Sequence, residues 1–349
     1  MRIVIASTYV PFIKGGGTMI VESLHSELAR RSYQVDVVKI PLRSYWADLP
    51  QQTLALRCLD LTESAGNTID LLITIRYPSY ALRHPNKVAW FIHHHRGAYD
   101  LWGTKYQDVP ATPEGVRFRE MLIRSDTLYL NEAKRIFTNS KVVASRLKKY
   151  NNIEANGVLY PPLPDPKPFH AGEFGDYFIY ASRLAPIKRQ FMAVEAMQYV
   201  KSNFKLVLVG TADVPSYADE LQQLVERCGV ADRVRFTGWL SEDDKAALTV
   251  NAYAALYIPF DEDSYGYSSL EAFHSHKPVI TLRDSGGTDE VIEDGMNGLI
   301  LDSTPEALAE GMERLWADKA GVARMGANAH ETLRVHQIDW EHVIQGLVG

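Results

Sequence analysis

Two carboxylates bracket a short glycine turn in the segment Asp263-Ser-Tyr-Gly-Tyr-Ser-Ser-Leu-Glu271. Gly266 predicts a tight turn, and a helix reading Ser-Leu-Glu-Ala-Phe follows it. The backbone N–H groups at a helix N-terminus carry partial positive charge, which favours a phosphate or a sugar oxygen. The carboxylate of Glu271, one turn into the helix, suits the hydroxyls of a ribose or another sugar because it accepts strong hydrogen bonds. The segment therefore predicts a binding site for a nucleotide sugar.

Length and composition describe a globular chain that is long enough for two domains. The 349 residues are 46% hydrophobic and 23% charged, and the longest apolar runs are strand-sized, well below the roughly 18 residues that span a bilayer. The first apolar run, Ile3–Ala6, is shorter than the core of a signal peptide and predicts a buried strand. Cys58 and Cys228 form neither a metal motif nor a disulfide framework, so we expect a reducing cytoplasm.

Apolar runs alternate with helical patterns along the chain, which predicts doubly wound parallel sheets. Five prolines lie between residues 160 and 168 and predict a stiff, extended linker. We therefore expect two Rossmann-like domains, one of residues 1–160 with a C-terminal helix at about 331–349, and one of residues 169–330. The expected strands are Ile3–Ala6, Val35–Val38, Leu71–Ile75, Val88–Ile92, Ile136–Asn139, Tyr177–Ala181, Lys205–Val209, Val234–Phe236, Ala254–Ile258, Pro278–Ile280 and Gly298–Leu301.

The order of motifs in the second half carries the strongest functional signal. These motifs are Ser182–Lys188 after a strand, Val209-Gly210, Val234–Trp239, Asp263–Glu271, Gly286–Glu290 and Asp294–Gly298. Their succession resembles the donor domain of the retaining glycosyltransferases of family four (glycosyl transferases group 1) over nearly all of residues 177–302. The acidic pair resembles that family's Glu-x7-Glu element with Asp263 in the first position. The resemblance implies the α/β fold called GT-B, in which two Rossmann-like domains face each other across a cleft that holds the ligands.

The resemblance also implies roles for two cations and two acids. Arg183 and Lys188 match the family's Arg and Lys pair, which stabilises the charge growing on the leaving diphosphate. Arg189 stands where the family usually has Gly. Glu271 matches the acid that holds the nucleotide ribose, and Asp263 matches the acid near the donor sugar, although it is one methylene shorter than Glu.

Further donor contacts follow from the same resemblance. Gly266, Tyr267, Ser268 and Ser269 are expected to supply backbone and hydroxyl donors to the diphosphate and the sugar, and the backbone near Trp239 is expected to read the nucleotide base. In the first half, Gly15, Gly16 and Gly17 resemble the family's glycine loop, which approaches the donor diphosphate or the acceptor. Taken alone, these three glycines predict only a permissive turn.

Three adjacent histidines, His93–His95, follow an apolar run and are expected at the carboxyl edge of the first sheet. His93 falls where the family often carries a histidine near the reacting sugar, and His95 is the second candidate. Because strand side chains alternate, the three rings cannot face one way, which argues against a metal site. Asp261-Glu-Asp263 has the Asp-x-Asp pattern of a metal-dependent glycosyltransferase class, but that class is built on a single nucleotide domain. We therefore expect no metal and no cofactor apart from the UDP- or GDP-sugar, which is a substrate.

The predicted activity is transfer of a hexose, with retention at the anomeric carbon, to a hydroxyl of a glycan or a lipid-linked glycan in bacterial polysaccharide or lipopolysaccharide synthesis. The resemblance implies that the leaving diphosphate accepts the proton of the acceptor. A nucleotide-sugar epimerase and a non-catalytic nucleotide-sugar-binding protein remain as alternatives. A nicotinamide-dependent dehydrogenase is disfavoured because no Gly-x-Gly-x-x-Gly follows Ile3–Ala6.

Charge is divided unevenly along the chain. The net charge is −6, yet residues 1–160 carry 21 Lys and Arg against 14 Asp and Glu. One interpretation is that the basic half contacts the anionic inner face of the cytoplasmic membrane, or a diphosphate-linked acceptor. The other is a solvated helix face. We expect a cytoplasmic protein and no nucleic-acid partner.

Overall fold

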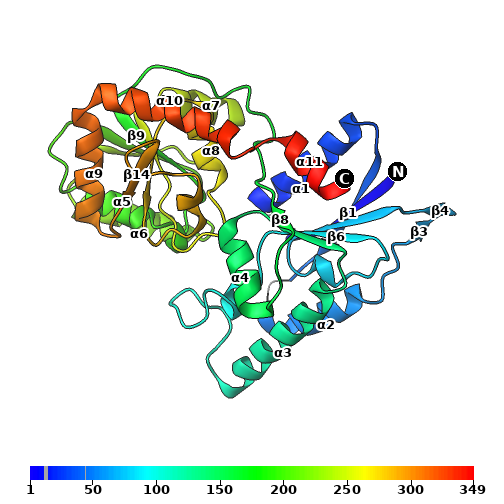
Figure 1. Ribbon diagram of the computed structural model, residues 1–349. Coiled ribbons are helices and arrows are strands. Elements are labelled where there is room, and N and C mark those ends of the chain that lie inside the picture. Colours follow the sequence, from blue (N-terminus) through cyan, green and yellow to red (C-terminus); the bar gives the residue numbers. More distant parts are fainter. Residues whose placement is uncertain (12–14, 44) are drawn as a thin grey trace. The chain divides into compact units, whose positions relative to one another are not determined.

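The computed structural model describes residues 1–11, 15–43 and 45–349. The chain divides into two compact units (Figure 1). Unit 1 comprises Met1–Pro164 and Asp339–Gly349, and unit 2 comprises Asp165–Ile338. The chain therefore leaves unit 1 within the proline-rich segment and returns to it after unit 2.

Unit 1 is built on a six-stranded sheet with the strand order β2-β1-β5-β6-β7-β8, in which all neighbours are parallel. Every residue of the central strands β5 and β6 is buried, as expected for strands covered on both faces. A two-stranded hairpin, β3 (Glu63–Ser64) with β4 (Asn67–Thr68), lies outside this sheet. The strands of the sheet are β1 (Arg2–Tyr9), β2 (Gln34–Pro41), β5 (Leu71–Ile75), β6 (Lys87–Phe91), β7 (Arg135–Thr138) and β8 (Gly157–Val158).

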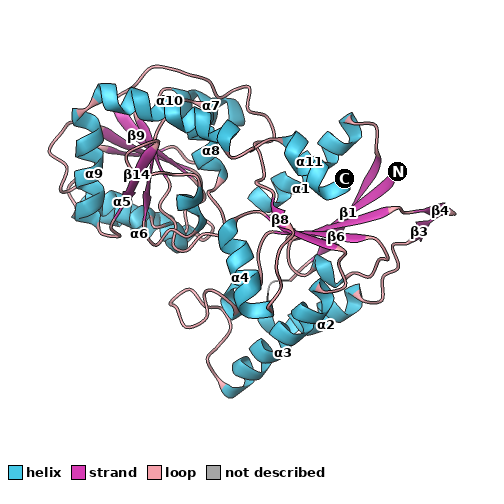
Figure 2. Cartoon of the chain, in the orientation of Figure 1, coloured by secondary structure: helices cyan, strands magenta, loops and turns pink. Residues whose placement is uncertain are grey.

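Helices cover both faces of this sheet, with α1 and α11 on one side and α2 and α3 on the other (Figure 2). The last of them, α11, is fixed to unit 1 by side chains at both of its ends. The indole N–H of Trp340 donates to the carbonyl of Leu163 at 3.2 Å, and the guanidinium of Arg135 donates to the carbonyls of Gly346, Leu347 and Gly349. The helices are α1 (Gly16–Arg30), α2 (Leu49–Leu56), α3 (Pro113–Leu130), α4 (Lys141–Asn151) and α11 (Trp340–Val348), with 3-10 turns at η1 (Trp46–Asp48), η2 (Ser79–Ala81) and η3 (Arg96–Ala98).

Unit 2 repeats this architecture with a second parallel sheet, ordered β11-β10-β9-β12-β13-β14. Strand order reverses at β9, which has β10 on one side and β12 on the other. Ligands in open α/β sheets bind at the carboxyl ends of the strands beside such a reversal. The strands are β9 (Tyr177–Ala181), β10 (Lys205–Val209), β11 (Val234–Phe236), β12 (Ala254–Leu256), β13 (Val279–Leu282) and β14 (Gly298–Leu301).

Side-chain caps begin three helices of unit 2, namely α7, α9 and α10. The Ser241 hydroxyl accepts from the amide of Asp244, and the Thr304 hydroxyl accepts from the amide of Ala307. The expected helix near residues 331–349 consists of two helices, because α10 stops at Val335 and Asp339 then caps α11. The helices are α5 (Gln190–Ala196), α6 (Pro215–Arg227), α7 (Glu242–Val250), α8 (Tyr267–His274), α9 (Pro305–Ala317) and α10 (Lys319–Val335), with 3-10 turns at η4 (Pro186–Lys188) and η5 (Gly287–Glu290).

The predicted α/β class with parallel sheets in two domains is confirmed. Within residues 1–11, 15–43 and 45–349, no helix has both the length and the apolar character that crossing a membrane requires.

Candidate active site

The two predicted cations both follow β9 in unit 2. Arg183 lies directly after the strand, is half-exposed, and forms an ion pair with Asp213, which lies beyond β10. Lys188 ends η4 and is largely buried, with its ammonium paired to Glu262 and donating to the hydroxyl of Tyr257 at 3.2 Å. Both cations therefore lie at the carboxyl edge of the sheet, beside the reversal in strand order.

Glu262 is a site residue that the sequence motifs did not identify. Its carboxylate pairs with Lys188 and accepts from the Tyr257 hydroxyl at 3.3 Å. Burial and the neighbouring Glu262 raise the pKa of Tyr257, so this hydroxyl stays a hydrogen-bond donor. Glu262 is the middle residue of the Asp261–Asp263 pattern, directly before the predicted acid Asp263.

The turn before α8 requires glycine. Gly266 has a φ of 73°, and a Cβ added there would lie 2.3 Å from the Tyr257 ring. The Ser268 hydroxyl donates to the carbonyl of Ala181 at the end of β9, and the Ser269 hydroxyl donates to the carbonyl of Tyr265 at 2.7 Å. Ser268 therefore holds the N-terminus of α8 against the edge of the sheet, and Ser269 ties the helix to the turn before it.

Glu271 is buried in the second turn of α8 and is paired. Its Oε1 accepts from the ammonium of Lys245 on α7 at 2.7 Å, and Lys245 also contacts Glu242 at 2.8 Å. Burial raises the pKa of the Glu271 carboxyl, and Lys245 opposes that rise. Burial alone would lower the pKa of Lys245, but the two carboxylates outweigh it and raise this pKa, so the ammonium keeps its charge.

Arg189, which stands where the resemblance expects glycine, occupies a backbone conformation that favours glycine, with a φ of 57°. Its buried guanidinium forms a bidentate pair with Asp284 at 2.8 Å for each bond, and it donates to the carbonyls of Ile258 and Pro259. Burial alone would raise the pKa of Asp284, but Arg189 and Ser303 outweigh it and hold this pKa below its ordinary value. Arg189 thus ties the loop that carries Lys188 to the loops after β12 and β13.

Trp239 lies in the loop after β11 with 69% of its surface exposed. The loop is held at Gly238, whose carbonyl accepts from the amide of Gly210 at 3.0 Å. Gly210 itself packs so closely on the backbone of Ser182 that a Cβ would lie 2.1 Å from the Ser182 carbonyl oxygen. The exposed indole is thus held at the same edge of the sheet as the cations.

In unit 1, the glycine loop and Arg76 lie together. Gly15 caps α1, Gly16 and Gly17 begin it, and a Cβ on Gly17 would lie 3.0 Å from the Cδ of Arg76. Arg76 follows β5 and donates to the carbonyl of Thr8 at 3.0 Å. This close approach gives Gly17 a steric reason to be glycine.

His93 follows β6 and is held in one tautomer. Its Nδ1 lies 2.7 Å from the carbonyl of His94, so Nδ1 carries the proton and Nε2 is an acceptor. Burial, with Arg76 nearby, lowers the pKa of His93 to about 4, so the ring is neutral at physiological pH. Such a ring can accept a hydrogen bond from a sugar hydroxyl.

The next two histidines face other partners. His94 is buried, stacks on Tyr99 at a centroid distance of 4.1 Å, and contacts Asn151 at 2.7 Å. The Nε2 of His95 lies 3.4 Å from the carboxylate of Asp108. Among the described residues, no group of three His, Cys, Asp or Glu side chains could hold a metal ion. The absence of a metal requirement stays a prediction.

Behind these histidines, the hydroxyl of Tyr99 donates to the carboxyl of Asp126 at 2.7 Å. Asp126 lies on α3 and is fully buried. Burial raises the pKa of Asp126 to about 7, although hydrogen bonds from Tyr99 and Tyr80 and the proximity of His95 oppose the rise. This carboxyl therefore holds its proton to a higher pH than an exposed aspartate does.

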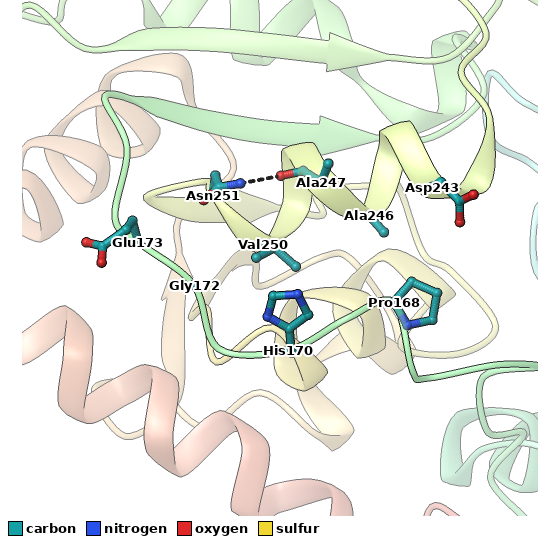
Figure 3. A pocket seen from close by; sticks show the side chains of 9 residues that line it. All are labelled: Pro168, His170, Gly172, Glu173, Asp243, Ala246, Ala247, Val250 and Asn251. Atoms are coloured by element: carbon teal, nitrogen blue, oxygen red, sulfur yellow. Dashed lines mark hydrogen bonds between the residues drawn. The ribbon is translucent and has the colours of Figure 1, made fainter.

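An open pocket of about 420 Å³ lies elsewhere in unit 2, between α7 and the segment that enters the unit. Figure 3 shows His170 and Pro168 on that segment facing α7. The α7 residues in its wall recur every three or four positions, whereas Lys245 is on another face of the helix. None of the predicted site residues lines the pocket. Its wall is formed by Pro168, His170, Gly172, Glu173, Asp243, Ala246, Ala247, Val250 and Asn251.

Comparison with known proteins gives a family match in the second half of the chain. Residues 167–332 match the family described as glycosyl transferases group 1. The D-inositol 3-phosphate glycosyltransferase of Xylanimonas cellulosilytica is 27% identical over 181 residues, covering 49% of this chain and 40% of that protein. The GDP-mannose-dependent alpha-(1-6)-phosphatidylinositol monomannoside mannosyltransferase of Mycobacterium tuberculosis is 32% identical over 162 residues, covering 43% and 40%. The alignments thus span less than half of each of these relatives.

Solved structures extend the similarity to both units. Sucrose-phosphate synthase from Thermosynechococcus elongatus superimposes with a TM-score of 0.78 at 18% identity, over 98% of this chain and 96% of that chain. Anabaena HepE in complex with UDP superimposes with a TM-score of 0.75 at 18% identity, over 99% of both chains. The chain has the GT-B fold.

The GT-B assignment confirms the predicted fold class, and the family match includes Arg183, Lys188, Lys245, Glu262 and Glu271. The glycine loop and His93 lie outside the residues that match the family. The roles of all these side chains remain predictions.

Proposed function

We propose that this protein is a retaining glycosyltransferase that transfers a hexose from a nucleoside diphosphate sugar to a hydroxyl of a glycan or a lipid-linked glycan. One observation carries the proposal. Arg183 and Lys188 lie at the carboxyl edge beside the reversal in strand order, next to the N-terminus of α8, whose second turn holds Glu271. The family match over residues 167–332 supports it.

The proposed donor carries UDP or GDP. A relative is named as GDP-mannose-dependent and a structural neighbour was solved with UDP, so both bases have support. In the proposed complex, Arg183 and Lys188 neutralise the diphosphate, Glu271 accepts from the ribose hydroxyls, and the loop at Trp239 contacts the base. Asp263 lies nearest the donor sugar in this assignment.

The proposed chemistry needs no separate protein base. The bond between the anomeric carbon and the diphosphate oxygen breaks, and the two cations stabilise the charge that grows on that oxygen. The same oxygen accepts the proton of the acceptor hydroxyl as the new glycosidic bond forms on the face from which the diphosphate leaves. His93 accepts a hydrogen bond from a sugar hydroxyl in this proposal, and its neutral ring with Nδ1 occupied supports that role.

A panel of ligands tests the donor class by thermal shift. A nucleotide present at about 100 times its dissociation constant stabilises the folded protein by about 2.7 kcal/mol. We expect a shift with UDP or GDP, and with their sugar conjugates, that EDTA does not change. A shift with NAD alone, or one that EDTA abolishes, would overturn the proposal in favour of a dehydrogenase or a metal at Asp261–Asp263.

Lys188→Ala distinguishes catalysis from binding. A transferase loses turnover by roughly 10²–10³ when one preorganised group of this kind is removed. Lys205→Ala is the matched control, because Lys205 forms an exposed pair with Asp176 at 2.9 Å. A variant that loses only nucleotide affinity indicates a binding protein. Donor that is consumed without acceptor and appears as an epimer indicates an epimerase.

The proposed acceptor is presented at an anionic membrane surface on the cytoplasmic side, in polysaccharide or lipopolysaccharide synthesis. A relative 32% identical over 162 residues is named for lipopolysaccharide core biosynthesis, in Rhizobium meliloti. On α3, the exposed residues Arg117, Met121, Arg124 and Leu128 recur at helical spacing and alternate cationic with apolar side chains. Such a stripe suits an anionic lipid surface.

Vesicle flotation tests this contact. We expect binding to vesicles with anionic lipid at low salt, weakened at high salt and in the Arg117→Ser/Arg124→Ser double variant. Equal partitioning with neutral and anionic vesicles contradicts the membrane contact and leaves the stripe a solvated helix face.

A further inference from the structure

Lys245 has no place in any motif of the sequence, yet it is the cation beside the most buried acid of the candidate site. Its ammonium lies 2.7 Å from Glu271 and 2.8 Å from Glu242, and only 17% of its side chain is exposed. Glu271 is a buried carboxylate with 5% of its side chain exposed. A buried carboxylate without a partner is strongly disfavoured, so Lys245 has a direct electrostatic effect on Glu271.

The other groups near Glu271 do not replace Lys245. Glu242 lies on α7 and repels a negative charge on Glu271. Tyr267, on the first turn of α8, interacts electrostatically with Glu271, and its buried hydroxyl has no hydrogen-bond partner among the described residues. A phenol gives no compensating positive charge. Within this cluster, Lys245 therefore supplies the positive charge that offsets Glu271.

We propose that Lys245 is a positioning residue that holds the Glu271 carboxylate in its charged form and in one orientation for the ribose hydroxyls of a nucleoside diphosphate. This inference rests on the proposed function, because it assigns Glu271 to the nucleotide. A charged carboxylate accepts from two neighbouring hydroxyls at once, whereas a protonated one has to use an oxygen as a donor. Lys245 thereby lets Glu271 bind the nucleotide down to a lower pH than it could without this partner.

The sign of the effect follows from burial. Burial raises the pKa of Glu271, and removing Lys245 takes away the group that opposes the rise. In Lys245→Met, which retains an unbranched apolar side chain of similar length, Glu271 becomes protonated at a higher pH than in the wild type. Nucleotide affinity of this variant therefore begins to fall at a higher pH than that of the wild type as the pH is lowered.

Calorimetric titration with UDP and GDP between about pH 5.5 and 8.5 tests the inference. We expect Lys245→Met to bind at least tenfold more weakly than wild type at the acidic end, with a smaller deficit at the alkaline end, and Lys245→Arg to restore most of the affinity. Glu271→Gln should bind weakly at every pH, and adding Lys245→Met to it should change little. Lys205→Met, at the exposed pair with Asp176, is the matched control.

Two calorimetric results would overturn the inference. In the first, Lys245→Met binds the nucleotide as tightly as the wild type at every pH. In the second, Lys245→Met loses nucleotide affinity by the same factor at every pH, and the loss persists in the Glu271→Gln background. Carbon-13 NMR of the Glu271 carboxyl in the ligand-free protein gives a second readout, in which Lys245→Met should raise the titration midpoint of Glu271. An unchanged midpoint overturns the inference even if no nucleotide binds, whereas wild-type protein that binds no nucleoside diphosphate overturns the proposed function instead.

Discussion

The ammonium of Lys188 and the carboxylate of Glu262 form an ion pair that joins η4 to the loop after β12, across 74 positions of the chain. Both side chains are largely buried, with 13% and 19% of their surfaces exposed. The cation assigned to the donor diphosphate is therefore already neutralised in the ligand-free protein. A diphosphate has to share Lys188 with Glu262 or displace it.

Glu262→Gln is expected to increase the affinity for UDP or GDP by roughly 3–30-fold, because it removes the negative charge that competes for Lys188. Isothermal titration at neutral pH measures the change. Asp176→Asn, at the exposed pair with Lys205, is a control that leaves Lys188, Lys245 and Glu271 untouched. A lower affinity in Glu262→Gln would show instead that Glu262 itself contributes to the bound state.

Arg189→Ala is expected to destabilise unit 2 by about 2–4 kcal/mol, since it leaves Asp284 and two backbone carbonyls without their buried donor. Arg189→Gly should be less destabilising than Arg189→Ala by about 1 kcal/mol, because glycine adopts a positive φ without strain. Urea unfolding measures both. Arg283→Ala, at an exposed pair with Asp302, should cost less than about 1 kcal/mol. Equal losses in Arg189→Ala and Arg283→Ala would contradict the anchoring role.

Asp126→Asn is expected to change the pH dependence of stability. Asp126 has a native pKa of about 7 and an unfolded value near 4, so between these values the native state holds a proton that the unfolded state has released. The contribution of Asp126 to stability therefore falls as the pH rises from about 4 to 7. The stability of Asp126→Asn relative to wild type should rise over that range, by at most about 1.4 kcal/mol per pH unit.

Urea unfolding at a series of pH values checks this sign. Glu313→Gln is the control, because hydrogen bonds from the Ser202 hydroxyl and the Lys201 and Ser202 amides hold the pKa of Glu313 low against the effect of burial. Its stability relative to wild type should stay level between about pH 5 and 8. A constant difference between Asp126→Asn and wild type across that range would show that Asp126 is ionised in the native state throughout.

Gly266→Ala is expected to destabilise the protein by more than the roughly 1–2 kcal/mol that its positive φ alone costs. The added methyl group has to displace Tyr257, whose hydroxyl contacts both Lys188 and Glu262. Nucleotide affinity should fall together with stability. Gly229→Ala is the matched control, because Gly229 has a φ of 66° and open space around it, so only the backbone cost applies. Equal effects of the two substitutions would contradict the contact with Tyr257.

The parallel sheets and the position of the candidate site follow from local sequence. Runs such as Leu71–Ile75 are apolar at every position except Thr74 because both faces of the strand are buried, and this near-continuous apolar character is visible in the sequence alone. Glycine at position 266 and the acid at 271 likewise reflect one turn and the helix that follows it.

The partners of these side chains could not be predicted in the same way. Lys245 meets Glu271 across 26 positions and Lys188 meets Glu262 across 74, and both pairings depend on how separate helices and loops pack. Arg189 illustrates the limit further, since an arginine at a positive φ contradicts local preference and is held by Asp284, 95 positions away. The division between α10 and α11 depends on a cap at Asp339, which helical periodicity does not show.

Because α11 completes unit 1 but follows unit 2 in the chain, the ribosome synthesises all of unit 2 before it synthesises the segment that unit 1 still lacks. Until then, the carbonyl of Leu163 has no indole donor from Trp340, and Arg135 has none of its three carbonyl acceptors on α11. The nascent chain therefore carries a finished unit 2 beside an unfinished unit 1. Exposed apolar surface in such a chain lies on unit 1, which makes that unit the expected binding place for chaperones during synthesis.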